Sequence, residues 1–224
     1  NNDPEDLVKN VLGNEFLLAG GHGPGRGDTD GGISDNDIIL GDNGKLVYVA
    51  SLDKDGVDDP NFGKLAYVQT TDTSNDYGGA DTVYGQLGDD IIFGGVNSSV
   101  DVLTGSLGQD VILGDNGLIH FNYDWMSDDD RSDFDSIDDI GDFDVTTIDL
   151  IRSFTDGWGG IDIISGDADA DVLIGGEAGD IIYGDNATAS NGAGDLGDVI
   201  LGDNGDVLII ISSHHYGYYL CNPI

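Results

Sequence analysis

The chain has 224 residues, of which 44 are acidic and only seven are basic, giving a formal net charge of −37 at pH 7. This charge excludes proteins that hold nucleic acid on a basic surface and disfavours docking on an anionic membrane. No apolar run approaches the ~20 residues that a membrane-spanning helix needs, so we expect neither nucleic-acid binding nor membrane insertion. All but three of the acidic residues are aspartate and 37 residues are glycine, which favours turns over helices.

One short motif recurs along the chain: aspartate, any residue, an aliphatic residue, any residue, glycine. Its copies follow one another at steps of nine residues or close to it, and the segments between them are rich in turn residues. We interpret each copy as a short strand that directs one aliphatic side chain inward, because no helical period is present. The copies begin at Asp37, Asp81, Asp90, Asp101, Asp110, Asp162, Asp171, Asp180 and Asp198.

These copies divide the chain into alternating segments, which we expect to form one continuous elongated domain. An N-terminal strand and glycine-rich lead-in (1–30) precede three repeat blocks, and two β excursions separate the blocks. The third block leads into a C-terminal apolar strand and aromatic tail (206–224), interpreted as an excursion that the chain does not complete, as in a piece of a larger tandem array. The repeat blocks are 31–44, 78–117 and 159–205, and the excursions are 45–77 and 118–158.

The repeat blocks resemble the glycine-rich nonapeptide repeats of RTX proteins, written GGxGxDxUx. This resemblance implies an all-β fold, a calcium-bound parallel β-roll or β-solenoid, here with hairpin-like excursions between the blocks. The chain departs from the family pattern at many positions where paired glycines are replaced by Gly-Asp or Gly-Gln.

The aspartates give a physical reason for a cation. In a β-roll, turns 18 residues apart stack at the strand spacing of ~4.8 Å, where two carboxylates repel by roughly 3–4 kcal/mol at a dielectric of about 20. We expect Asp162, Asp180 and Asp198 to stack in one column, Asp81 on Asp101, and Asp90 on Asp110, with the column of Asp171 broken by residues 188–192. Several Ca²⁺ ions suit such oxygen-rich turns better than Mg²⁺ or zinc. The alternative is that each aspartate braces its own turn without metal.

Other acidic residues are weaker candidates. Asp42, Asp115, Asp185 and Asp203 follow a repeat glycine directly, and their side chains either ligate metal or brace the turn. Residues 53–56 resemble part of a calcium loop but lack EF-hand spacing, so a solvated excursion tip is the simpler interpretation. The run 128–139 is interpreted as an exposed acidic loop rather than as extra calcium sites.

We expect no enzyme in this chain. The sequence shows no combination of a nucleophile, a base and an orienting group. A pair of carboxylates can indicate a glycosidase, but among so many aspartates such pairs arise everywhere and indicate nothing. The glycine-rich segment 21–27 lacks the lysine and hydroxyl residue of a phosphate-binding loop. His214, His215 and Cys221 could be imagined as a metal site, but adjacent residues on a strand point to opposite faces, so a packed tail is favoured.

The favoured function is a secreted bacterial building block of an adhesin, surface layer, filament or biofilm matrix, outside the cell or on its surface. The chain would associate end to end with other copies of the repeat, residues 207–211 and the tyrosines after them pairing with the apolar segment 10–21 of a neighbour. Alternatively these strands only cap the chain's own ends. A second function is a non-catalytic secretion and folding module of a larger secreted enzyme. A third is an adhesin tip whose Trp125 and Trp158 contact cell-surface glycans.

Overall fold

The computed structural model describes residues 16–19, 36–48, 64–121, 148–154, 157–185, 196–212 and 215–221. For residues 16–19, 208–212 and 215–221 it describes the strand path and not the side chains. The acidic segments 53–56 and 128–139, the glycine-rich segment 21–27, and Trp125 and His214 lie outside the described residues.

The described residues form sixteen strands and no helix, which confirms the all-β class expected from the sequence. The sequence was interpreted as one continuous domain, whereas the contacts divide the chain into two compact units. The chain passes repeatedly from one to the other. The first unit comprises Asn1–Asn43, Thr70–Asn116 and Ser153–Asn204, and the second comprises Gly44–Gln69, Gly117–Arg152 and Gly205–Ile224.

No helix that could cross a membrane occurs in the part of the chain that the structure describes.

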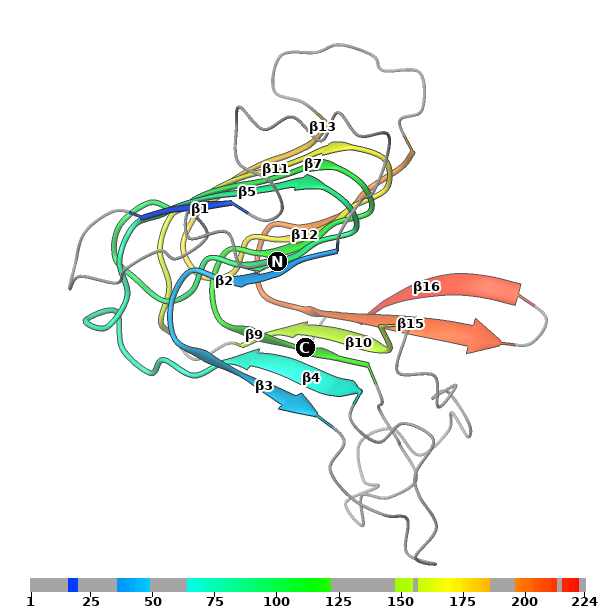
Figure 1. Cartoon of the computed structure of the whole chain (residues 1–224), viewed down its shortest axis with the longest axis horizontal. Coiled ribbons are helices and arrows are strands. Elements are labelled where there is room, and N and C mark those ends of the chain that lie inside the picture. The colour runs from blue at the N-terminus through cyan, green and yellow to red at the C-terminus, as the bar shows by residue number, and fades with distance from the viewer. Residues whose placement is uncertain are drawn as a thin grey trace, which may run out of the picture. The chain divides into compact units, whose positions relative to one another are not determined.

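The first unit contains two parallel five-stranded sheets, and the chain alternates between them (Figure 1). Every pair of neighbouring strands in these two sheets is parallel, as expected where a connection returns the chain to the same side. The first sheet, sheet A, has the order β1 (Phe16–Ala19), β5 (Asp81–Leu87), β7 (Val102–Leu107), β11 (Ile163–Ala168) and β13 (Ile181–Asp185). The second, sheet B, has the order β2 (Ile38–Leu40), β6 (Ile91–Phe93), β8 (Val111–Leu113), β12 (Val172–Ile174) and β14 (Val199–Leu201).

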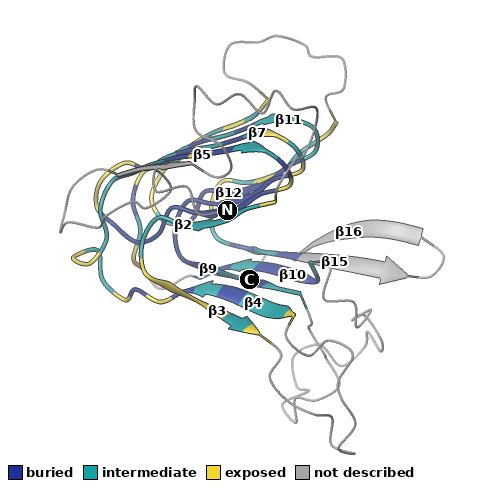
Figure 2. Cartoon of the chain, viewed as in Figure 1, coloured by how far each residue is buried: buried dark blue, intermediate teal, exposed yellow. Residues whose placement is uncertain are grey.

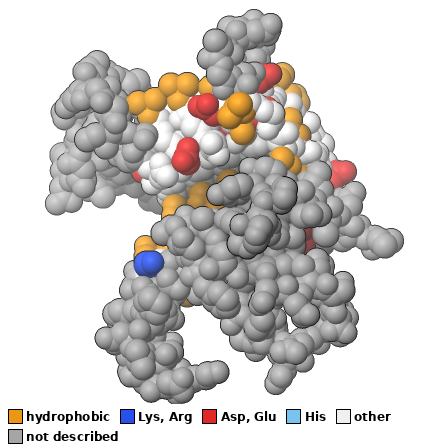
Figure 3. Space-filling view, turned by 90° about the vertical axis from the view of Figure 1, so that its right-hand side faces the viewer, with side chains coloured by type: hydrophobic (Ala, Val, Ile, Leu, Met, Phe, Trp, Pro, Cys, Tyr) orange, Lys and Arg blue, Asp and Glu red, His pale blue; other side chains and the backbone are white. Residues whose placement is uncertain are grey.

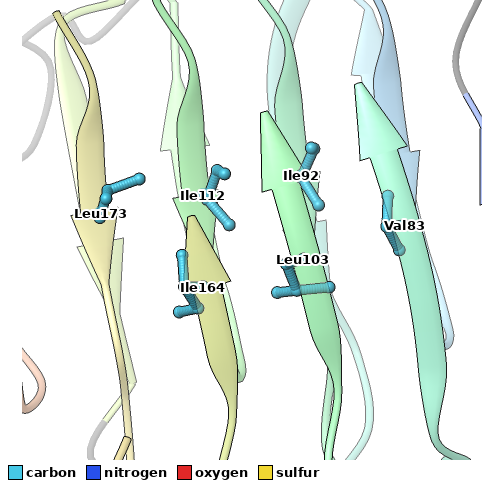
Figure 4. Packing of buried hydrophobic residues seen from close by; sticks show 6 residues of the cluster. All are labelled: Val83, Ile92, Leu103, Ile112, Ile164 and Leu173. Atoms are coloured by element: carbon cyan, nitrogen blue, oxygen red, sulfur yellow. The ribbon is translucent and has the colours of Figure 1, made fainter. Parts of the chain in front are cut away.

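The core of this unit is a double row of aliphatic side chains, one from the middle of each motif (Figure 4). Their regular spacing follows from the register, in which each side chain lies opposite its equivalent on the next strand. The fully buried members are Val83, Leu103 and Ile164 of sheet A and Ile92, Ile112 and Leu173 of sheet B. The inward direction predicted for these residues is therefore confirmed.

The last strands of the stack are less covered than the central ones, as the colours of Figure 2 show. Ile39 and Ile182 pack against the core and are partly buried. Ile200, which occupies the same position on β14, is 46% exposed. It was predicted to point inward with the others, but β14 is an edge strand with β12 as its only neighbour among the described strands.

The second unit contains a single antiparallel sheet, sheet C, whose six strands lie in the order in which the chain forms them. Each excursion from the first unit therefore adds two neighbouring strands to one shared sheet. These strands are β3 (Gly44–Tyr48), β4 (Leu65–Thr70), β9 (Gly117–His120), β10 (Leu150–Ser153), β15 (Asp206–Ser212) and β16 (His215–Cys221). Arg152 and Asp206, opposite each other on β10 and β15, form an ion pair through two N–O contacts of 2.8 Å each.

The structure bears on two expectations about the chain ends. The third excursion is complete within the chain, because β16 pairs with β15 along seven residues in antiparallel register. The N-terminal strand β1 pairs in parallel with β5 of sheet A. Both β1 and β15 therefore pair with strands of their own chain, as in the alternative in which they cap its ends. Sheet C does not need residues 10–21 of a neighbouring copy to pair with β15.

Candidate functional site

The nine repeat aspartates form two columns in the first unit. In each column, the backbone N–H of one aspartate donates to Oδ1 of the aspartate on the following strand of the stack, at N–O distances between 2.7 and 3.1 Å. Column 1, before the strands of sheet A, is Asp81, Asp101, Asp162 and Asp180. Column 2, before the strands of sheet B, is Asp37, Asp90, Asp110, Asp171 and Asp198.

The columns agree with the predicted stacking except at Asp198. Asp162 and Asp180 stack at a separation of 18 residues, and Asp81–Asp101 and Asp90–Asp110 stack at 20, as expected. Asp198 was predicted to follow Asp180, but its Oδ1 accepts from the backbone N–H of Asp171, 27 residues earlier. The reason is that β13 belongs to sheet A, so a longer connection precedes the return to sheet B at β14. The column of Asp171 is therefore continuous.

The columns are buried despite their charge. Asp101, Asp162 and Asp90 are fully inaccessible, and Asp110, Asp171 and Asp81 are at most 2% exposed. On the face seen in Figure 3, red acidic side chains are few among the described atoms. Burial of an ionised carboxylate is costly unless the charge is compensated.

The second carboxylate oxygen, Oδ2, faces the final glycine of the preceding motif in the chain, whose strand belongs to the other sheet. A Cβ added at Gly41 would overlap Oδ2 of Asp81 and the carbonyl oxygen of Gly94. A Cβ at Gly114 would overlap Oδ2 of Asp162 and the carbonyl oxygen of Gly175 in the same way. The motif's final glycine is therefore required for close approach: its missing side chain leaves room where a carboxylate and a main-chain carbonyl converge.

These oxygen atoms lack donors. Within the described residues no hydrogen-bond donor reaches either oxygen of Asp81, nor Oδ2 of Asp110, Asp162, Asp171 or Asp180. Asp101 differs, because its Oδ2 accepts a hydrogen bond of 2.8 Å from the Asn97 side chain. A native protein leaves few buried polar atoms unpaired, so the recurring oxygen without a donor along both columns requires either a proton or a cation.

Burial raises the pKa of the column carboxyls. Desolvation is the largest cause, and neighbouring carboxylates add to it, while the backbone hydrogen bond to Oδ1 opposes it. The pKa of Asp81 rises to about 6 and those of Asp110, Asp162 and Asp171 to about 7. That of Asp101, between Asp81 and Asp162, rises to about 8. Without a cation, burial therefore favours the protonated form of these groups over the charged one.

Asp42 and Asp115 lie beside column 1, where the chain leaves the first unit through a Gly-Asp-Asn exit motif. Oδ1 of Asp42 accepts from the backbone N–H of Gly79 at 3.1 Å, and Oδ1 of Asp115 accepts from that of Gly160 at 2.9 Å. Oδ2 of Asp115 also accepts from Glu177. Both residues thus hold the returning chain against the point of exit, which is the bracing role left open by the sequence.

The same two residues also enlarge the acidic group at column 1. Burial raises the pKa of Asp42 to about 7, helped by the nearby Asp81, and that of Asp115 to about 8, helped by Asp162. Oδ2 of Asp42 is buried without a hydrogen-bond donor among the described residues. Asp185 and Asp203 differ from this pair: Asp185 ends β13, Asp203 follows β14, and both are exposed.

Sequence reasoning missed the role of the asparagine in the exit motif. The carbonyl oxygen of Asn43 accepts from the backbone N–H of Thr71, and that of Asn116 accepts from Phe154. The Asn43 side chain donates to Asp72, and the Asn116 side chain donates to the carbonyl oxygen of Asp72. The sequence feature that could have indicated this role is the repetition of Gly-Asp-Asn before each excursion.

The donor set fits a hard divalent cation such as Ca²⁺, because it consists of carboxylate and main-chain carbonyl oxygens. No three His, Cys, Asp or Glu side chains converge as a metal-binding group within the described residues. A bound ion at these corners must therefore draw on the glycine carbonyls as well as on one or two aspartates. Comparison with known proteins found no matching family model, no curated protein and no solved structure.

Proposed function

We propose that the first unit is a parallel β-roll of the RTX type and that the chain folds on binding several Ca²⁺ ions. The ions would sit at the two corners of the roll, between consecutive turns. Asp81, Asp90, Asp101, Asp110, Asp162, Asp171, Asp180 and Asp198 would supply Oδ2, with Asp37 heading column 2. Asp42 and Asp115 would add negative charge beside column 1 while bracing the returning chain.

The observation that carries the proposal is the repeated pairing of an aspartate Oδ2 with a glycine carbonyl oxygen around a glycine Cα. The pairing recurs at Gly41, Gly94, Gly114 and Gly175 along column 1, where each glycine faces the carbonyl of the next glycine in the series or of Gly202. At Gly85 and Gly166 it recurs along column 2. A carboxyl oxygen and a carbonyl oxygen that converge need either a proton or a cation between them, and oxygen ligands of this kind are those that Ca²⁺ prefers.

Weak sites are sufficient for folding on calcium. Extracellular modules bind Ca²⁺ with dissociation constants of about 10⁻⁴–10⁻³ M. At a 10- to 100-fold excess of the ion over that constant, each site contributes about 1.4–2.7 kcal/mol to the folded state. Because the columns offer many equivalent corners, about six such contributions sum to roughly 8–16 kcal/mol, which is comparable with the marginal stability of about 5–15 kcal/mol of a typical domain.

We further propose that the folded chain is an extracellular structural element of a bacterial surface or matrix and is not an enzyme. The support is architectural: repeated strands stack on one another, the excursions build a separate sheet, and the buried charged side chains of the first unit are mostly repeat aspartates. Trp158 is 40% exposed and remains a candidate for glycan contact. A calcium-dependent fold suits a protein that becomes rigid only outside the cell.

Calcium titration tests the proposal. Protein stripped with a chelator is titrated with CaCl₂ while far-UV circular dichroism reports strand formation and isothermal calorimetry reports binding. We expect a cooperative gain of β structure with calcium and a far weaker response to MgCl₂, because Mg²⁺ demands octahedral geometry. A spectrum that does not change with calcium, or an equal response to both ions, contradicts the proposal.

A further inference from the structure

The same eight residues, DVILGDNG, occur twice in the chain in different surroundings. At residues 110–117 they form β8 and an exit motif, and at residues 198–205 they form β14 and the next exit motif. β8 has β6 on one side and β12 on the other, whereas β14 has β12 alone among the described strands. Ile112 of β8 is therefore fully buried, and its counterpart Ile200 is 46% exposed.

The hydrogen bonds of β8 show what the open side of β14 is built to hold. On the side of β12, the carbonyl oxygen of Asp110 accepts from Val172 at 2.8 Å, and the N–H of Gly114 donates to Ile174 at 2.9 Å. Their counterparts in the second octapeptide are Asp198 and Gly202. Because Val199 and Leu201 bond to the strand already present, the backbone groups of Ile200 face the open side.

At the opposite edge of sheet B lies β2, whose sequence resembles that of β12, the strand that pairs with β8. β2 has β6 as its only neighbour among the described strands, and its segment 37–41 reads DIILG, close to the DVLIG of β12. The carbonyl oxygen of Asp37 and the N–H of Gly41 bond to β6. The backbone N–H and C=O groups of Ile38 and Leu40 therefore face outward. They have the same spacing as the groups of Val172 and Ile174 that form hydrogen bonds with β8.

We propose that two copies of this chain join head to tail, β14 of one copy pairing in parallel with β2 of the next, so that sheet B continues across the junction. Ile38 of the second copy would donate to the carbonyl oxygen of Asp198, and Gly202 would donate to Leu40. Sheet A would continue at the same junction, since β13 and β1 are its edge strands and β13 exposes Ile181 and Tyr183. The two ends differ, so the contact is heterologous and produces open series of copies.

This inference rests on the proposed calcium-dependent fold. Each copy carries a net charge of −37, and the junction would bring column 2 of one copy onto Asp37 of the next. Two such ends repel one another unless a cation lies between them. Association should therefore require Ca²⁺ and should not be produced by NaCl of equal ionic strength.

Two proline variants test the junction. Proline lacks the N–H and is tolerated on edge strands, so Ile200→Pro and Ile38→Pro each remove one outward donor without breaking the bonds to β12 or β6. Each variant keeps one intact end. In CaCl₂, sedimentation velocity should show a series of sizes for the unchanged chain and monomers for each variant, with association weakened at least about tenfold. An equal mixture of the two variants should form dimers and nothing larger.

Circular dichroism of each sample in CaCl₂ separates this inference from the proposed function. If the unchanged chain gains β structure with calcium but stays monomeric, the junction is refuted and the calcium-dependent fold stands. If Ile38→Pro alone still associates as a folded protein, the contact is not head to tail and the inference is refuted. If calcium produces no structure at all, both ideas fail. Leu107→Lys, a change at a 51% exposed residue of the internal strand β7, should associate like the unchanged chain.

Discussion

Replacing Asp162 by asparagine should have opposite effects with and without calcium. Asp162 is fully buried in the middle of column 1, its Oδ1 accepts from the N–H of Asp101 at 3.1 Å, and its Oδ2 lies with the carbonyl oxygen of Gly175 beside Gly114. Asparagine keeps the shape and the Oδ1 acceptor, and its amide N–H₂ can donate to that carbonyl. It also removes the negative charge that a bound cation would use.

The magnitude without calcium follows from the pKa. Burial raises the pKa of Asp162 from 3.8 to about 7, and a rise of about three corresponds to about 4 kcal/mol. Because the folded-state pKa is the higher one, the folded state is favoured at low pH and this advantage is lost as pH rises from about 4 through 7. Asp162→Asn should therefore stabilise the calcium-free protein relative to the unchanged chain by about 1 to 2 kcal/mol at pH 5 and by up to about 4 kcal/mol at pH 8.

With calcium the sign should reverse. The variant loses one charged ligand, so the calcium concentration at the folding midpoint should rise by about tenfold or more, equivalent to at least about 1.4 kcal/mol. Urea unfolding followed by circular dichroism, in chelator and in CaCl₂, measures both effects, with sucrose added where the calcium-free folded state needs support. Asp76→Asn, at an exposed position, is the control and should change neither. Equal destabilisation by Asp162→Asn in chelator and in calcium would show that the column is an ordinary hydrogen-bonded ladder.

Three further outcomes are expected. Gly114→Ala places a methyl group against the carbonyl of Gly175 and should lower the free energy of unfolding in calcium by about 2–3 kcal/mol in the same urea assay. Gly179→Ala is the control: Gly179 has open space around it, so this change should alter the free energy of unfolding by less than about 0.5 kcal/mol. Gln86→Gly should raise that free energy by up to about 1 kcal/mol, since Gln86 has a φ of 83°; a loss of stability would contradict this reasoning. Asp115→Ala removes the acceptor of two backbone N–H groups, so hydrogen exchange there should accelerate at least about tenfold, and unchanged protection would show that the carboxylate does not hold the returning chain.

The sequence period predicted the parts of the fold that depend on local repetition. A motif of fixed length places its aliphatic residue inward and its aspartate at a corner, so the core row from Val83 to Leu173 and most of both columns could be foreseen. The place of Asp198 in column 2 could not be predicted, because it depends on which sheet the preceding strand joins. That choice is made by pairing between β11 and β13, not by the spacing of aspartates.

The second unit was harder to foresee for a related reason. The excursions were expected as hairpins or pairs of strands, but nothing predicted that all their strands share sheet C. Open strand edges pair with one another when the chain brings them together. Asn43 and Asn116 were also missed as anchors of the returning chain, since the partners Thr71 and Phe154 lie far along the sequence and carry no common motif. Long-range pairing of this kind leaves little trace in composition or period.

The two identical octapeptides have a genetic consequence. A crossover in frame between the coding regions for residues 110–117 and 198–205 would duplicate or delete the segment 110–197 without changing a residue at the seam. Each duplication would insert β8 to β13 in frame: two strands for each parallel sheet and one hairpin for the antiparallel sheet. Length in such a gene can therefore vary by whole modules, and natural variants differing in copy number would keep every corner, exit and register intact.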